Sequence, residues 1–424
     1  MNMLQTILKQ LWNEKRHAVW LLLELVVVFL FLLLEVDFSW IKLKNYREPR
    51  GFDVENTYRL ELKRLTPGAI GYLPAEGLEQ TEAEMLDRLV GQLELHPDVE
   101  AVGYSRMASP TARGGWWTML FRRDSLGEVN LQGRTVDEGY LKVFRLHRVD
   151  GGALDVKAAD RKQLLVSGLA CEKMNYASLA DVPGDTLYMD TGEDRREAFL
   201  VTAVYEELKS QPFRPYSPSF FEVPTRQQWN EVLQRDQAQR TELWLRVREG
   251  RDAHFREHFK QEMGERLWAG QIYVSSVVSV EDEMRKMIDT EVRQEVAPMM
   301  YVLLFVLLTA FLGVFGTFWL RTRQRCSEVG IRMAMGASRQ TVWRLFMLEG
   351  VCLAAVAVLP ALLIYVNLLY AEVLNVYDLP FTAGRVLLVL AVSLLVLLAM
   401  ILAGIWFPAR QASRMNPVDA LRDE

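Results

Sequence analysis

The residues with the clearest catalytic spacing are His254, Glu257 and His258, which spell the zinc-peptidase pattern H-x-x-E-H. On a helix, histidines four residues apart present both imidazoles on one face, where neutral rings can bind Zn²⁺. Catalysis would also need a third ligand and a placed base. The surrounding stretch RDAHFREHFKQEMGERL has the pattern of a charged amphipathic helix, with Phe255 and Phe259 on its apolar side. Because common helix-surface residues often produce this pattern by chance, we expect no metal site, and a metalloprotease remains an alternative.

Other catalytic patterns are absent from the sequence. It contains no G-x-x-x-x-G-K-[ST], so the chain has no Walker loop to hold nucleotide phosphates. It also lacks G-x-S-x-G and cysteine pairs with metal-ligand spacing. We therefore expect no cofactor and no catalytic residue.

A basic stretch at residues 321–350 lies between two long apolar runs. Its arginines face a single acid, Glu328, before the next apolar run; they are Arg321, Arg323, Arg325, Arg332, Arg339 and Arg344. A short loop this rich in arginine stays on the cytoplasmic side of a membrane. Glu328 and Arg332 have the favourable i,i+4 order for a helical pair. Gly336 can end this helix and Ser338 can cap the next, so we expect a short helix below the membrane.

The same stretch carries a family signature. Residues 327–338, SEVGIRMAMGAS, closely resemble the E-[IV]-G-[IV]-R-x-A-x-G-A-[ST] motif of the MacB/FtsX-like ABC transporter permeases. A second motif, P-A-x-x-A-x-x-x-x-P-x-x-A-L-R-x-E, ends those proteins, and residues 408–424 resemble it. Between residues 136 and 223 the sequence is also similar to the family's extracytoplasmic core domain, at Tyr140, Phe144 and Gly184 among others.

The resemblance implies a permease-only, mechanotransmission-type (type VII) protein without its own ATPase domain. Such permeases form homo- or heterodimers with two ABC ATPase subunits, whose ATP-driven closure moves the cytoplasmic helix. The spans pass that motion to the outer domain, for efflux or for lipoprotein or peptide export. Further expected partners are membrane lipid and a periplasmic adaptor or substrate. The ATPase-coupling residues implied are Arg325, Glu328, Val329, Gly330, Arg332, Met333 and Gly336. Those of the C-terminal signature are Pro408, Arg410, Pro417, Leu421 and Arg422.

Hydropathy predicts four membrane spans, since about 20 apolar residues cross a bilayer. The spans are residues 18–36, 299–320, 346–370 and 386–407. The positive-inside rule predicts three cytoplasmic parts, which are an amphipathic lead-in at 1–17, a coupling loop at 321–345 and a tail at 408–424. The parts expected outside are residues 37–298 and a short loop at 371–385. We therefore expect a multi-pass protein of the inner (plasma) membrane with both termini in the cytoplasm.

Residues 37–298 contain 36 Lys and Arg against 44 Asp and Glu, a net charge of −8. This balance argues against nucleic acid or anionic lipid as the main partner of this part, because both require a basic face. Cys171 is its single cysteine, so an internal disulfide is excluded and the domain must be held by its own core.

The periodicity of this part predicts an α+β domain inserted between the first and second spans. Alternating residues predict strands at 56–65 and 99–105, and an amphipathic pattern predicts a helix at 81–95. We expect an inserted lobe at about 67–135. A further helix is predicted at 281–295, running directly into the second span.

Two questions stay open from the sequence. Glu24 lies within the first span, where it is either a relay carboxylate or a glutamate near the interface that is protonated or bonded to a neighbouring helix. We favour the second interpretation because no other charge within the spans pairs obviously with it. A membrane-anchored receptor or sensor, with the basic loop as a topology signal only, is the other alternative function.

Overall fold

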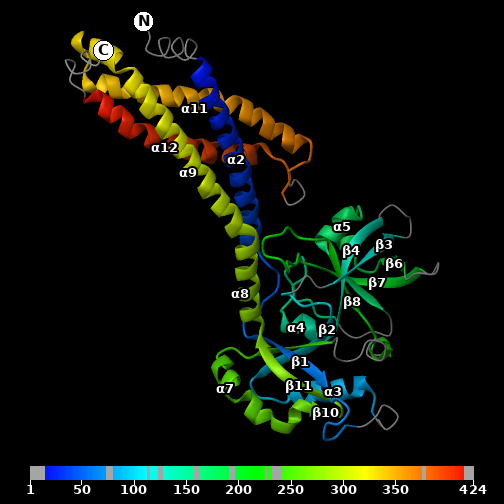
Figure 1. Cartoon of the computed structure of the whole chain (residues 1–424). Coiled ribbons are helices and arrows are strands. Elements are labelled where there is room, and N and C mark those ends of the chain that lie inside the picture. The colour runs from blue at the N-terminus through cyan, green and yellow to red at the C-terminus, as the bar shows by residue number, and fades with distance from the viewer. Residues whose placement is uncertain are drawn as a thin grey trace. The chain divides into compact units, whose positions relative to one another are not determined.

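The computed structural model describes residues 15–72, 80–111, 115–122, 128–156, 162–190, 196–225, 227–231, 241–374 and 379–414. The chain divides into two compact units (Figure 1). One unit joins the N-terminal residues up to Lys44 with Glu291–Glu424, and the other is Asn45–Thr290. The described part of the first unit is helical, whereas the second mixes helices with a sheet.

The first unit is a helical bundle. Its helices are α2 (Lys15–Arg47), α9 (Ala297–Gln324), α10 (Cys326–Ala334), α11 (Arg339–Tyr370) and α12 (Ala383–Ser413). Within the described residues, four helices are long and apolar enough to cross a membrane: Val19–Arg47, Val280–Gln324, Arg339–Tyr370 and Ala383–Ser413. Each of the four predicted spans therefore lies within one of the helices α2, α9, α11 and α12.

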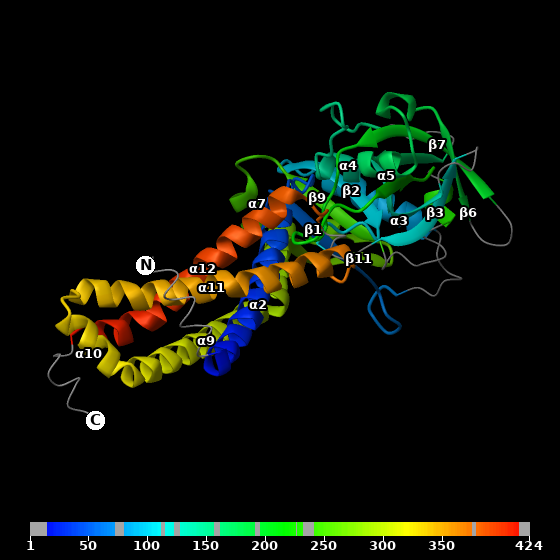
Figure 2. The same cartoon turned by 90° about the horizontal axis from the view of Figure 1, so that it is seen from above.

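The bundle core is formed by apolar side chains from all of its helices. Helix α12 packs against both α9 and α11, and Figure 2 shows α11 and α12 side by side. Large apolar side chains also remain on the outer surface of the bundle, such as Tyr301, Phe305 and Leu363, as is normal for helices that face lipid.

The helix before α9 continues into it. Helix α8 (Val280–Glu291) is followed by one π-helical turn, η5 (Val292–Val296), and then by α9. Pro298, the second residue of α9, has no backbone N–H to donate to the preceding turn, and the π-helical turn lies directly before α9. The predicted helix running directly into the second span is therefore confirmed.

The second unit contains one eleven-stranded sheet, in the order β10-β11-β1-β9-β2-β4-β3-β6-β7-β5-β8. The strands are β1 (Thr57–Arg64), β2 (Val99–Arg106), β3 (Trp116–Arg122), β4 (Glu128–Val136), β5 (Gln163–Ser167), β6 (Thr186–Asp190), β7 (Arg196–Tyr205), β8 (Ser219–Val223), β9 (Glu242–Val247), β10 (Trp268–Ala269) and β11 (Ile272–Ser279). The short helices are α3 (Glu82–Glu94), α4 (Glu138–Val143), α5 (Gly168–Lys173), η2 (Leu179–Asp181), α7 (Asp252–Met263) and η4 (Gly264–Leu267). This is the α+β domain predicted between the first two spans.

One part of the sheet carries the first core. Strand β1 lies between β9 and β11 and is antiparallel to both. The apolar faces of α3 and α7 share a core with β1, β2, β9 and β11. Helix α3 begins with a capping box, in which the Glu84 amide donates to Thr81 Oγ1 at 3.3 Å and the Thr81 amide donates to Glu84 Oε2 at 2.8 Å.

The other part of the sheet closes on itself. Because β4 also pairs in parallel with β8, strands β4, β3, β6, β7, β5 and β8 form a ring. A second core, which includes the fully buried Cys171 of α5, fills this part.

Helix α4 joins the two parts of the sheet through a close backbone contact. Its N-cap Asp137 accepts hydrogen bonds from the amides of Tyr104, at 2.9 Å, and Tyr140, at 2.7 Å. A Cβ at Gly103 of β2 would lie 2.0 Å from the Tyr140 nitrogen, so this position has no room for a side chain. Tyr140 and Phe144, noted in the sequence, are both buried in a third core around α4.

The expected lobe at residues 67–135 is divided between the two parts of the sheet. Its helix α3 and strand β2 pack with β9, whereas β3 pairs with β4 and β6. In the described residues this segment is therefore not a lobe of its own, because each of its strands finds partners from later in the chain.

Candidate functional site

Helix α10 is the short helix predicted between the second and third spans. Arg325 separates it from α9 with φ −102° and ψ 15°. Within α10, Arg332 Nη2 donates to Glu328 Oε1 at 2.6 Å, which confirms the predicted pair. Gly336 ends the helix with φ +96°, a left-handed conformation that glycine adopts without strain. Ser338 then caps α11 by accepting from the Thr341 amide at 3.2 Å.

The packing of α10 turns one of its faces into the bundle. Val329 and Met333 are both among the implied ATPase-coupling residues, and the Val329 side chain is 4% exposed and belongs to the bundle core. Met333 is partly buried against that core, and Gly330 is also buried. The bundle itself therefore occupies the Val329 face of the helix.

The exposed face of α10 presents other apolar residues. Ile331 is 49% exposed and Met335, directly after the helix, is 76% exposed. They are four residues apart and therefore lie on the same side of the chain. A partner that contacts α10 would meet these two side chains rather than Val329.

A buried ion network fixes the connection between α9 and α11. Arg321 Nη1 donates to Glu349 Oε1 at 2.9 Å, and Arg325 Nη1 donates to Glu349 Oε2 at 3.1 Å. All three side chains are largely buried, at 6%, 11% and 5% exposure respectively. Arg325, one of the implied coupling residues, caps the end of α9 and contacts α11 through Glu349. Glu349 was missed because it lies inside an apolar run.

A second buried pair lies in the same bundle. Arg385 of α12 binds Asp37 of α2 through two hydrogen bonds of 2.7 Å, from Nε to Oδ1 and from Nη2 to Oδ2. The Arg385 guanidinium also donates to the Leu379 carbonyl. This fork geometry is the strong form of the arginine–carboxylate pair. From the sequence, both residues counted only as loop charges.

Glu24 lies against a glycine of α9. A Cβ placed on Gly313 would come within 2.2 Å of Glu24 Oε1, so the carboxyl group is packed close to this helix. No described residue forms an ion pair with Glu24. This arrangement agrees with a glutamate that contacts a neighbouring helix.

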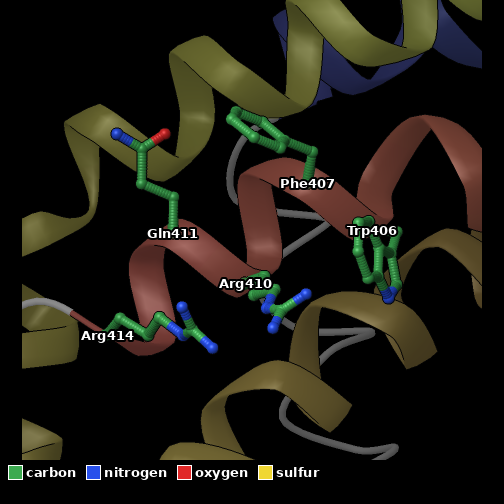
Figure 3. A pocket seen from close by; sticks show the side chains of 5 residues that line it. All are labelled: Trp406, Phe407, Arg410, Gln411 and Arg414. Carbon is green, nitrogen blue, oxygen red and sulfur yellow. The ribbon is translucent and has the colours of Figure 1, made fainter.

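The C-terminal signature begins within α12. Pro408 is buried in the helix, and the Arg410 guanidinium lies 5.1 Å from the centre of the Trp406 ring. Figure 3 shows Trp406 and Arg410 projecting from one side of α12, together with Arg414. Pro417, Leu421 and Arg422 lie outside the described residues.

The histidines of the H-x-x-E-H pattern lie on α7, and each makes a hydrogen bond. His254 Nδ1 lies 2.7 Å from Asp98 Oδ2, and His258 Nδ1 lies 3.1 Å from the His254 carbonyl. The two rings are stacked with their centres 4.5 Å apart. Glu257, the base that the pattern requires, is exposed.

Within the described residues, His96, Asp98 and Glu262 form one group whose ligand-type atoms lie within 4.8 Å of one another. The Asp98 amide donates to His96 Nδ1 at 3.2 Å, so a neutral ring carries its proton on Nε2. That nitrogen lies 3.1 Å from Glu262 Oε2. Because a protonated nitrogen has no lone pair for a metal, this arrangement is a hydrogen-bonded network.

The fold and the α10 connection define a class, which is a multi-pass membrane protein with an α+β domain between its first two spans. Residues 300–417 match the family model described as FtsX-like permease C-terminal. The C-terminal part of the chain is therefore similar to the FtsX-like permeases.

Named relatives match the chain over part of its length. The pyoverdine export ATP-binding/permease protein PvdT of Pseudomonas entomophila (strain L48) is 34% identical over 125 residues, which cover 28% of this chain and 17% of that protein. The macrolide export ATP-binding/permease protein MacB of Shewanella sp. (strain ANA-3) is 30% identical over 118 residues, or 27% of this chain and 17% of that protein. The matched part of this chain thus spans about a sixth of the length of these relatives.

One solved structure with similarity is the periplasmic region of MacB from Actinobacillus actinomycetemcomitans. It is 12% identical, with a TM-score of 0.31, and the alignment covers 58% of this chain and 98% of that one.

Proposed function

We propose that this chain is the permease subunit of an ABC transporter. It receives motion from a separate ATPase subunit through α10 and passes it along the spans to the α+β domain. The family match over residues 300–417 supports this proposal, and so do the names of both relatives, which combine export, ATP binding and a permease. The proposed transport is efflux or the export of a lipoprotein or peptide. The proposed assembly is a dimer of permease chains with two ATPase subunits, together with a periplasmic adaptor or substrate.

The observation that carries the proposal is how α10 is attached. Its Val329 side is packed into the bundle core, and the residues just before it are tied to α11 through Glu349. A force on α10 therefore reaches α9 and α11 without first bending a flexible loop. On its other side, Ile331 and Met335 remain exposed for contact with a partner.

The proposed topology follows from charge. The segment from Arg321 to Arg344 has a net charge of +5, which favours the cytoplasm, where an ATPase would find its ATP. In this orientation both termini are cytoplasmic and the α+β domain lies outside. The Glu328–Arg332 pair beside the exposed apolar residues would add polar contacts at the rim of the interface.

The proposal is tested by placing charges on the exposed face of α10. We expect Ile331→Glu with Met335→Glu to abolish co-purification with the ATPase and permease-dependent ATP hydrolysis, since a buried unpaired carboxylate opposes docking. Membrane insertion should be unchanged because neither side chain is in the core. Ile70→Glu is the matched control, since Ile70 is 99% exposed in the α+β domain.

If the double variant keeps normal ATPase binding and full stimulation of ATP hydrolysis, α10 is not the docking element. A sensor whose basic loop only sets topology would then be the better interpretation. A proteolytic activity that requires Glu257 would instead support the metalloprotease.

A further inference from the structure

Each of the four membrane-spanning helices contains a tryptophan–arginine pair in which the two residues are four positions apart. The pairs are Arg16 with Trp20 in α2, Trp319 with Arg323 in α9, Arg339 with Trp343 in α11, and Trp406 with Arg410 in α12. The arginine precedes the tryptophan in α2 and α11 and follows it in α9 and α12. Because successive spans run in opposite directions, all four arginines lie one helical turn beyond their tryptophans, toward the end of the bundle that carries α10.

This pattern marks the level of the lipid headgroups. Tryptophan rings concentrate at the boundary between hydrocarbon and water, and arginines near span ends extend into the headgroup layer. In two of the pairs the guanidinium lies over the ring, at 5.2 Å for Arg323 on Trp319 and 5.1 Å for Arg410 on Trp406. The cations are thereby held at a fixed level.

At this level two neighbouring hollows lie along the C-terminal turns of α12. One hollow of about 610 Å³ is lined by Trp406, Phe407, Arg410, Gln411 and Arg414 (Figure 3). A neighbouring hollow of about 410 Å³ shares Trp406, Arg410 and Arg414, and adds Arg339 and Trp343 from α11 among its lining residues. Arginines from two helices therefore converge on one place.

The charges at this place are not balanced within the described part of the chain. None of Arg339, Arg410 and Arg414 forms an ion pair with a described carboxylate, and all three side chains are exposed. By contrast, Arg321 and Arg325 share Glu349, and Arg332 pairs with Glu328. Three cations beside exposed aromatic rings, with Trp406 at 47% and Phe407 at 51% exposure, suit a ligand with an anionic head and an apolar body.

We propose that these hollows bind the phosphate of an anionic glycerophospholipid. Arg339, Arg410 and Arg414 contact the phosphate, and Trp343, Trp406 and Phe407 contact the start of the acyl chains. A bound lipid of this kind would link α11 to α12 next to α10. Soluble phosphate shares the headgroup chemistry but lacks the apolar part, so the two sources can be separated.

The test uses the full chain purified in a neutral detergent, without any ATPase, so its result does not depend on the proposed transport function. Phosphatidylglycerol, phosphatidylcholine or inorganic phosphate is added, and the bound lipid and the unfolding temperature are measured. We expect only phosphatidylglycerol to be retained and to raise the unfolding temperature. Arg410→Gln with Arg414→Gln should weaken its retention about 25-fold, since each arginine near an anionic headgroup contributes roughly fivefold.

The control removes two charges from the same end of the bundle without touching the hollows. Arg332→Gln with Arg344→Gln should retain phosphatidylglycerol, and Arg410→Lys with Arg414→Lys should keep most of the binding, which separates lost charge from a misfolded bundle. If both glutamine variants lose phosphatidylglycerol retention equally, the lipid is held by the general positive charge of this surface, and the proposed site is overturned. Equal effects of phosphatidylcholine, or the same shift with inorganic phosphate, would overturn the assignment to an anionic lipid.

Discussion

At the scale of single residues, the buried Glu349 carboxylate balances the guanidinium groups of Arg321 and Arg325. Glu349→Gln would leave Arg321 and Arg325 buried without a counter-charge, which typically costs about 3–5 kcal/mol. We expect a large fall in the unfolding temperature of the purified chain and easier proteolysis at α10. Glu328→Gln is the control, because its half-exposed helical pair contributes only about 0.3–0.5 kcal/mol. Equal effects of both changes would contradict the role of the network.

Asp137 gives a prediction about pH. Burial raises the pKa of its carboxyl group to about 7, although the backbone amides of Tyr140 and Tyr104 oppose the shift. Because the pKa in the folded state lies above that in the unfolded state, this group stabilises the fold fully below about pH 4. That contribution is lost as the pH rises toward 7, by about 1.4 kcal/mol per pH unit.

The measurement compares Asp137→Asn with the natural chain. The amide keeps an oxygen for the cap but does not ionise, so we expect the variant to gain stability relative to the natural chain as the pH rises from 5 to 8. Thermal unfolding at several pH values gives this difference. Asp181→Asn at an exposed position should show no such trend. A pH-independent difference for Asp137→Asn would mean that the carboxylate is already ionised in this range.

At the scale of elements, the contact between β2 and α4 can be tested by comparing two glycine-to-alanine variants, one at the contact and one away from it. A Cβ on Gly103 would meet the backbone of α4, at 2.0 Å from the Tyr140 nitrogen, whereas a Cβ on Gly91 of α3 has no atom within 4 Å. Gly103→Ala should therefore destabilise the domain by about 1–3 kcal/mol or more. Gly91→Ala should stabilise it by up to about 1 kcal/mol, because alanine is the better helix former. Chemical unfolding should show changes of opposite sign in the free energy of unfolding of the two variants. A stabilising effect of Gly103→Ala would contradict this packing.

The helices were predictable from sequence because their signals are local. A long apolar run, the Ser338 cap, the glycine at 336 and the Glu328–Arg332 spacing each depend on residues within a few turns of one another. The face that α10 turns to the bundle was not predictable, because Val329 with Met333 and Ile331 with Met335 are both apolar pairs at helical spacing. Only packing decides between them, and it buried Val329.

The ion pairs of the bundle lie beyond such local reasoning. Asp37 and Arg385 are 348 residues apart, and nothing near either residue in the sequence indicates its partner. The strand order of the α+β domain was likewise not predictable, because β3 and β4 could be placed only after their partners β6 and β8 were known. The Trp–Arg spacing of the spans, in contrast, is readable from the sequence once their directions are assigned.

At the scale of the whole molecule, the native cysteines report the proposed topology. Cys171 is fully buried, and burial raises the pKa of its thiol to about 12, so it should not react while the domain is folded. Cys326 at the start of α10 is partly exposed. In intact spheroplasts, an impermeant thiol reagent should label Cys326 only after the membrane is permeabilised. Prompt labelling of Cys326 in intact spheroplasts would mean that every span has the orientation opposite to the one proposed.

The place of β1 in the sheet has a consequence for biosynthesis. This strand is made first, yet its neighbours β9 and β11 begin about 180 and 210 residues after it. At ribosomal rates of about 5–20 residues per second, β1 waits roughly ten seconds or more with both edges unpaired. The domain can complete its sheet only when the segment leading into the second span has been synthesised. A nascent chain halted before residue 242 would therefore present an open strand edge, and we expect it to need chaperones that the full-length chain soon releases.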